Sequence, residues 1–137
     1  NVVDPRAFYS QSRVVLVPSL CDESFGRVVV EAGFNGIPVL CSDRGALPEV
    51  CGVPELILSI PKKFTATSRI VPEPSETTRW VERIARFWDD EDYAQKKGVA
   101  LRERVARYAQ RRFEETTTRF FTRSARNADS YVVSRYI

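Results

Sequence analysis

The chain of 137 residues contains no histidine and no methionine, and it has only three cysteines. Without histidine a Cys/His metal site cannot be completed, and Cys21, Cys41 and Cys51 lack the spacing of a metal-ligand set. We therefore expect three reduced cysteines with structural roles. Because a natural chain starts with methionine and this one has none, we also expect a piece of a longer polypeptide.

Long apolar runs are absent too. No stretch approaches the roughly 20 apolar residues of a membrane span, and no charged-then-apolar segment stands at the N-terminus. The composition is 43% hydrophobic and 28% charged, which fits one domain with a modest core. These features predict a soluble, cytoplasmic protein.

The most informative stretch is 18–50, PSLCDESFGRVVVEAGFNGIPVLCSDRGALPEV. A short apolar run ends just before it at Pro18, as in a strand buried on both faces. Gly26 and Gly36 bracket a segment that suits a helix, and another apolar run follows. The predicted unit is strand, loop, helix and strand, over residues 14–17, 20–25, 27–35 and 37–41.

Two glutamates lie in this unit with seven residues between them. Glu31 is five residues beyond Gly26, roughly 7 Å down the helix axis at ~1.5 Å per residue. The N-terminus of such a helix, at the carboxyl end of a parallel strand, attracts phosphate. Glu23 lies in the loop ahead of it. The pattern predicts a phosphate flanked by two polyols, although two glutamates at this spacing are more often only solvated side chains.

The segment DESFGRVVVEAGFNGIPVLCSDRGALPEV resembles the donor-binding half of family 4 retaining glycosyltransferases of the GT-B fold, with their E-x(7)-E motif. The resemblance implies that Glu31 binds ribose hydroxyls of a nucleotide sugar. It implies that Glu23, the catalytic candidate, contacts hydroxyls of the transferred sugar without acting as a covalent nucleophile. The backbone N–H groups of Phe25, Gly26, Arg27 and Val28 would face sugar and phosphates. The implied donor-binding set is Glu23, Ser24, Phe25, Gly26, Arg27, Val28 and Glu31.

The implied fold is α/β, a Rossmann-like parallel sheet forming part of a GT-B C-terminal domain, followed by C-terminal helices. We expect a donor-binding core over 1–74 and a helical segment over 75–137 packing on it. An acceptor-binding N-terminal domain and a basic Arg/Lys pair that holds donor phosphates would precede the chain. The resemblance therefore supports donor recognition better than turnover, and we expect little activity from the fragment alone.

The implied reaction transfers a hexose from a UDP- or GDP-sugar, with retention, to a glycan or lipid-linked sugar, as in polysaccharide biosynthesis. No metal is expected, because the family lacks the Asp-x-Asp motif and the acids at 89–92 fit a helix junction better. Two alternatives stay open: a non-catalytic nucleotide-phosphate-binding or regulatory module, and an unrelated doubly wound domain such as a receiver-like unit. No nucleic-acid partner is expected.

The remaining segments give weaker signals. Residues 1–12 are typical of a short helix, and 61–74 of a polar connecting loop. We expect the loop cations Lys62, Lys63 and Arg69 to be solvated and not bound to phosphate. Ser75 is the predicted N-cap of a further helix. The apolar residues of that helix share one face and should pack: Trp80, Val81, Ile84, Phe87 and Trp88.

The end of the chain is basic, with nine arginines against four acidic residues from Leu101 onward. A helix is predicted from Tyr93 to Asn127, with Gly98 as a weak point. Its candidate buried positions are Leu101, Val105, Tyr108, Phe113, Phe120 and Phe121. We favour a solvated helix face over the alternative, a peripheral contact at the inner face of the membrane.

Overall fold

The computed structural model describes residues 8, 9 and 11–124, with side chains as far as 108. The chain divides into two compact units, 1–106 and 107–137. The first contains the sheet and the predicted site. The second is described up to residue 124, and there it is helical. The predicted division at residue 74 stays a prediction.

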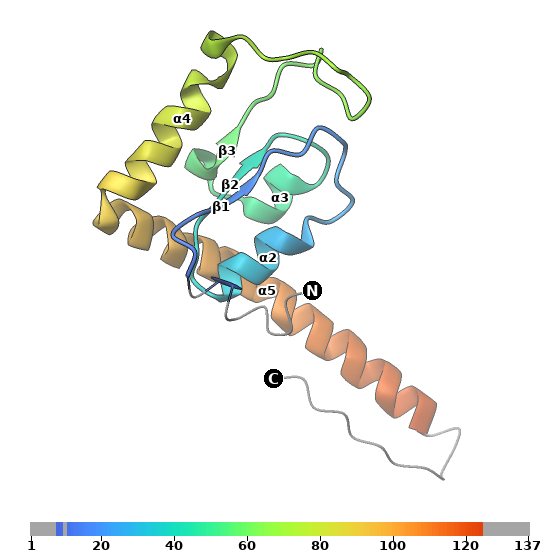
Figure 1. The fold of residues 1–137 in the computed structure, drawn as a ribbon. Coiled ribbons are helices and arrows are strands. Elements are labelled where there is room, and N and C mark those ends of the chain that lie inside the picture. Colours follow the sequence, from blue (N-terminus) through green and yellow to red (C-terminus); the bar gives the residue numbers. More distant parts are fainter. Residues whose placement is uncertain (1–7, 10, 125–137) are drawn as a thin grey trace. The chain divides into compact units, whose positions relative to one another are not determined.

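A parallel sheet of three strands forms the centre of the first unit (Figure 1). The strands are β1 (Val15–Val17), β2 (Val39–Ser42) and β3 (Ile57–Leu58), in the order β1-β2-β3. Val15 pairs with Val39, and Cys41 pairs with Ile57. All four residues of β2 are buried, as expected for a central strand between two parallel neighbours. The α/β class with a Rossmann-like parallel sheet is confirmed.

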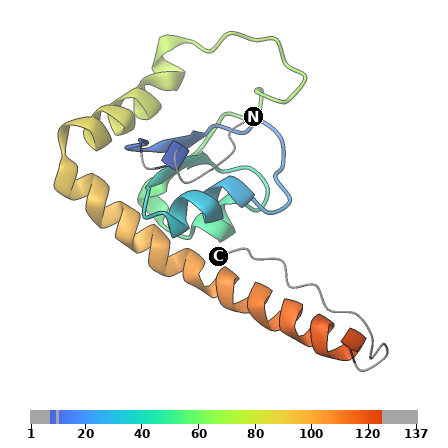
Figure 2. The same ribbon diagram turned by 60° about the horizontal axis from the view of Figure 1, so that its bottom comes forward.

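Helices α2 (Arg27–Phe34) and α3 (Leu47–Cys51) connect the strands and lie on one face of the sheet (Figures 1 and 2). Both connections advance in the same direction across a parallel sheet, so right-handed crossovers put both helices on the same side. A 3₁₀ turn, η1 (Pro54–Leu56), leads into β3. Val29, Leu47 and Leu56 are buried within this layer. The strand–loop–helix–strand prediction is confirmed with shifts of one or two residues at the ends of the elements.

Helix α4 (Pro74–Asp89) follows the long loop, and α5 (Glu91–Ser124) begins two residues later. Close approach of α2 to the early part of α5 depends on Gly33, where an added Cβ would lie 2.8 Å from Val105 Cγ2. Gly98 is equally constrained, because a Cβ there would collide with the carbonyl oxygen of Gly36. Gly98, predicted as a weak point, is instead a position of tight packing.

The start of α4 differs from the prediction. The N-cap is Glu73 rather than Ser75, and Pro74 is the first helical residue. Proline suits that position, since its missing N–H would have no partner there and its φ is already helical. Glu76 accepts a hydrogen bond from the backbone N–H of Glu73 at 3.0 Å, which completes a capping box.

The apolar stripe of α4 packs only in part. Phe87 is fully buried, and its carbonyl oxygen accepts a hydrogen bond of 2.9 Å from Arg13 Nε. Val81 is 62% exposed and Trp88 is 69% exposed. The prediction that the whole stripe packs is therefore wrong.

Other predictions meet the limits of the described residues. Phe8 and Tyr9 are helical, but residues 11 and 12 are not, so the helix predicted over 1–12 ends earlier than expected. Residues 1–7 and 10 lie outside the described residues. Leu101 and Val105 are buried as predicted. Nothing is described of the side chains of Phe113, Phe120 and Phe121. No helix in the described part of the chain is long and apolar enough to cross a membrane.

Candidate functional site

The loop that carries the first glutamate rests on the turn after the neighbouring strand β2. The backbone N–H of Ala46 donates to the carbonyl oxygen of Glu23 at 2.8 Å. The N–H of Gly45 donates to Asp22 Oδ1 at 3.1 Å. Gly45 has φ +55°, and an added Cβ would collide with the backbone of Glu23, so only glycine fits without a shift. Two loops that are adjacent at the sheet edge thus fix the backbone position of Glu23.

The side chain of Glu23 is also held. Ser19 Oγ donates to Glu23 Oε1 at 3.2 Å. The carbonyl oxygen of Ser19 accepts from Ser42 Oγ at 2.8 Å, and Ser42, the last residue of β2, is fully buried. A chain of contacts therefore connects the end of β2 to the carboxylate of Glu23. Glu23 is half-buried, so the residue remains partly accessible to a ligand.

Helix α2 begins at Gly26, which is buried and has the left-handed conformation φ 72°, ψ 51°. A Cβ there would lie 2.7 Å from Leu47 Cδ2. No side chain among the described residues caps the first turn, and that turn contains no acidic residue. Arg27 and Val28 are exposed at its start. The N-terminus of α2 thus presents backbone N–H groups and the positive end of the helix dipole, with no side-chain acceptor for them among the described residues.

Glu31 lies on α2, one turn after Arg27. Arg27 Nε is 2.9 Å from Glu31 Oε1, an ion pair at i, i+4. The hydroxyl of Tyr9 donates to Glu31 Oε2 at 3.2 Å. Burial first, and then the charge and hydrogen bond of Glu31, raise the pKa of Tyr9, so the phenol is protonated at neutral pH. Glu31 is half-buried and keeps an accessible edge.

All seven predicted site residues therefore lie on one continuous segment at the carboxyl end of β1. Glu23, Ser24 and Phe25 are in the loop, Gly26 is the N-cap, and the other three are in α2. Two residues that contact the glutamates, Tyr9 and Ser19, were not predicted. Ser19 follows the proline that ends the strand, but nothing in the sequence relates Tyr9 to a carboxylate 22 residues later.

A pocket of about 280 Å³ is lined by residues of the loop after β1, of the loop before α4 and of α4 itself. Pro18 and Leu20, on either side of Ser19, form one wall, and Trp80 of α4 contributes to another. The remaining lining is Ile60, Pro61, Phe64, Ser68, Ile70, Pro72, Glu76 and Thr77. Arg44 donates through Nη2 to the carbonyl oxygens of Ile60, Pro61 and Phe64 at 3.1, 3.1 and 3.2 Å, which holds the loop at this place.

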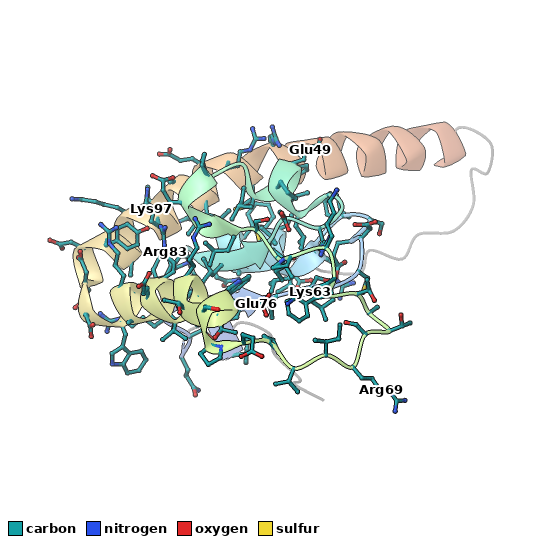
Figure 3. The ribbon with its side chains drawn as sticks, turned by 90° about the horizontal axis from the view of Figure 1, so that it is seen from above. Glu49, Lys63, Arg69, Glu76, Arg83 and Lys97 are labelled. Carbon is teal, nitrogen blue, oxygen red and sulfur yellow. The ribbon has the colours of Figure 1, made fainter. Side chains whose placement is uncertain are left out.

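The loop cations do not converge on the predicted phosphate position. Lys63 Nζ forms an ion pair of 2.6 Å with Glu76 Oε1. Arg69 is exposed and points away from the sheet at the end of the loop (Figure 3). Further along, Lys97 Nζ and Arg83 Nη1 both contact Glu55, at 2.6 Å to Oε1 and 3.1 Å to the carbonyl oxygen. These cations therefore have partners or positions outside the candidate site.

The acidic residues and the cysteines are the groups that could serve as metal ligands or reactive thiols. Among the described residues, no three Cys, Asp or Glu side chains cluster as a metal site would require. All three cysteines are free, with Cys41 and Cys51 buried and Cys21 exposed. A hydrogen bond with Cys51 and then burial raise the pKa of Cys41 well above its usual range, so this thiol stays protonated.

The chain is similar to known glycosyltransferases over most of its length. The family model for glycosyl transferases group 1 matches residues 1–112. A D-inositol 3-phosphate glycosyltransferase from Corynebacterium diphtheriae is 29% identical over 112 residues, which cover 77% of this chain and 23% of that protein. The chain thus spans less than a quarter of the length of the curated relative it matches. Because the family model covers most of its length, the chain belongs to the group 1 glycosyl transferases.

Proposed function

We propose that this chain forms the donor-binding part of a family 4 retaining glycosyltransferase of the GT-B fold, which takes its sugar from a nucleotide-diphosphate donor. The observation that carries the proposal is the N-terminus of α2, which no side chain among the described residues caps. A glutamate whose carboxylate accepts a hydrogen bond lies before it in the sequence, and a second lies after it. Glu23 precedes the helix and Glu31 is five residues beyond its N-cap. This arrangement suits a diphosphate between two groups that carry hydroxyls.

The diphosphate would lie at Gly26. N–H groups at a helix N-terminus and the helix dipole both favour an anion there. The left-handed conformation at Gly26 turns the chain sharply into the helix. In the transfer step these N–H groups would stabilise charge on the departing diphosphate, and donors of this kind contribute about 3 kcal/mol each.

Glu31 would bind the ribose. It lies roughly 7 Å from the helix start at ~1.5 Å per residue, about the distance from a diphosphate to the hydroxyls of the attached ribose. Its carboxylate accepts hydrogen bonds and donates none when ionised, which suits donors such as the hydroxyl groups of a ribose.

Glu23 would act on the transferred sugar. It would hold sugar hydroxyls and stabilise positive character at the anomeric carbon by its charge. Its side chain is restrained by Ser19 and its backbone by Ala46, so little reorganisation is needed during the reaction. We do not assign it as a covalent nucleophile, and the proposal includes retention of configuration without a metal ion.

The remaining parts of the proposal extend beyond this chain. The donor would be a UDP- or GDP-hexose, and the acceptor a glycan or a lipid-linked sugar, in polysaccharide biosynthesis. An N-terminal acceptor domain would complete the active site. We propose a cytoplasmic location with a solvated basic end, and peripheral contact at the inner face of the membrane is the alternative role of that end. The competing function is a nucleotide-phosphate-binding module without transfer.

Titration of the full-length protein with UDP, GDP and their sugars tests donor binding. A charged hydrogen bond contributes roughly 1.5–3 kcal/mol, so Glu31→Ala should weaken binding by about one to two orders of magnitude. Glu82→Ala, at an exposed position of α4, is the matched control. Equal affinity in the wild type and Glu31→Ala would refute this site.

Turnover separates the two functions. Glu23→Gln should lower kcat by about 10²-fold with a small change in donor KM, because the charge acts mainly in the transition state. Donor binding without any sugar transfer to glycan or lipid-linked acceptors would favour the non-catalytic module.

A further inference from the structure

We infer that Tyr9 is a positioning residue that orients the Glu31 carboxylate for a vicinal diol, an inference that rests on the proposed function. Tyr9 comes from the segment before β1 and Glu31 from the middle of α2. Their contact is a hydrogen bond of 3.2 Å from the phenol to Oε2. The contact lies outside the glutamate motif and joins two parts of the chain that the motif does not link.

The phenol is well anchored. Tyr9 is 5% exposed, and its carbonyl oxygen accepts from the N–H of Ser12 at 3.0 Å. Its ring packs edge-on against Phe8 at 5.3 Å between centroids. A tyrosine has only two side-chain torsions, so a buried one offers its hydroxyl to Oε2 with little loss of conformational freedom.

The other partner of Glu31 is different in kind. Arg27 contacts Oε1 at 2.9 Å, but its side chain is 78% exposed. Exposed ion pairs contribute little and exchange readily with water. Arg27 can therefore leave when a ligand arrives, whereas the buried Tyr9 keeps its bond. Tyr9 thus determines how the carboxylate faces the site.

The count of acceptor positions favours a diol. An ionised carboxylate offers about four lone-pair sites. Tyr9 and Arg27 occupy one on each oxygen, and 38% of the Glu31 side chain remains exposed. The open capacity, one position on each oxygen, matches two neighbouring hydroxyl groups such as those of a ribose. Holding the carboxylate in one orientation lowers the ordering needed when the ligand binds.

The test compares Tyr9→Phe with wild type in the full-length protein, using UDP and GDP and their 2′-deoxy forms as probes in calorimetric titrations. Phenylalanine keeps the ring and removes the hydroxyl. Tyr93→Phe is the matched control, since Tyr93 is also buried and its hydroxyl accepts from Arg83 at 2.9 Å, away from Glu31. Both variants remove one hydrogen bond, so their effects on folding should be alike.

Tyr9→Phe should weaken binding of the ribonucleotide about three- to tenfold, the range of one lost hydrogen bond, while Tyr93→Phe changes it little. The loss should shrink for the 2′-deoxy probe, because a group that acts through the diol has nothing to act on there. In a Glu31→Ala background, Tyr9→Phe should have almost no further effect, since the two residues act as one unit.

Other outcomes would overturn the inference, and they distinguish a failure of the role of Tyr9 from a failure of the proposed site. An equal loss with both probes assigns Tyr9 a structural role only. Unchanged affinity in Tyr9→Phe, with Glu31→Ala and the 2′-deoxy probe both binding weakly, rejects the role of Tyr9 and keeps the proposed site. A wild-type protein that binds neither nucleotide, or binds the 2′-deoxy form equally well, rejects the ribose role of Glu31 together with the inference.

Discussion

Gly45 lies directly against the backbone of Glu23, with no space for a side chain between them. The contact joins the turn after β2 to the loop after β1. In Gly45→Ala the new Cβ would have to displace the Glu23 backbone, and the alanine would have to adopt φ +55°. We expect a loss of roughly 2–4 kcal/mol in the free energy of unfolding, together with weaker donor binding.

Gly36→Ala is the control for Gly45→Ala. Gly36 also has a positive φ, +73°, but a Cβ there would meet nothing within 4 Å. Only backbone strain of about 1 kcal/mol should result. Urea unfolding measures both variants. Equal losses in the free energy of unfolding for the two variants would show that the contact of Gly45 with Glu23 does not contribute to stability.

Arg44 is expected to control the order of the loop over 60–64. Its Nη2 serves three carbonyl groups of that loop, so Arg44→Ala leaves all three without this donor. Trypsin should then cut faster after Lys62 and Lys63, and stability should fall by about 1–3 kcal/mol. Arg69→Ala, at an exposed position of the same loop, should leave the cleavage rate at these two bonds unchanged. A cleavage rate in Arg44→Ala equal to that of the wild type would contradict the role of the three Arg44 hydrogen bonds.

Asp43 gives a prediction for pH. Burial alone would raise its pKa, but hydrogen bonds from Ser59 Oγ at 2.6 Å and Ile60 N–H at 3.1 Å, with nearby Arg44, hold the pKa below its usual value. A lowered pKa in the folded state stabilises the fold above the unfolded pKa of about 3.9, and this contribution disappears as pH falls through the folded pKa.

The comparison is between wild type and Asp43→Ala in urea unfolding from about pH 6 to about pH 3. Wild type should be more stable at the upper end, and the difference should narrow toward the lower end. Other carboxylates titrate alike in both proteins, so the difference isolates Asp43. A gap that is constant over this range would mean that the charge of Asp43 does not contribute.

Gly33 should be intolerant of substitution. A Cβ would lie 2.8 Å from Val105 Cγ2 and 3.1 Å from Leu101 Cγ, so Gly33→Ala forces α2 away from α5 or shifts these side chains. Overpacking of this kind costs about 1–3 kcal/mol. Val105→Ala should be destabilising alone but should partly rescue Gly33→Ala. Strict additivity of the two losses would exclude a direct contact.

Much of the fold was predictable because its signals are local. Apolar runs marked β1 and β2, and Gly26 and Gly36 marked the two ends of α2. Helix α3 was missed because five residues are too few to show a period. It is stabilised by burial of Leu47 and Val50 rather than by its own propensity. Packing against residues distant in the sequence therefore stabilises α3.

The site divides in the same way. The motif identifies Glu23 and Glu31 as candidates, but it does not indicate which residues orient them. Tyr9 reaches Glu31 across 22 positions, and Ser42 reaches Ser19 across 23. No local pattern encodes such pairs. The exposure of Trp88 has a related cause, since α4 buries only Phe87 of its stripe and a helical period does not reveal how much of a face is covered.

Strand β1 has consequences for handling the protein. Within the described residues it pairs only with β2, although its sequence VLV is that of an interior strand and Leu16 is 44% exposed. Any preparation in which the other side of β1 stays unpaired offers a short apolar template to a second molecule. Self-association through this edge would grow with protein concentration. Experiments at high concentration should therefore use a form of the protein in which that side of β1 is covered.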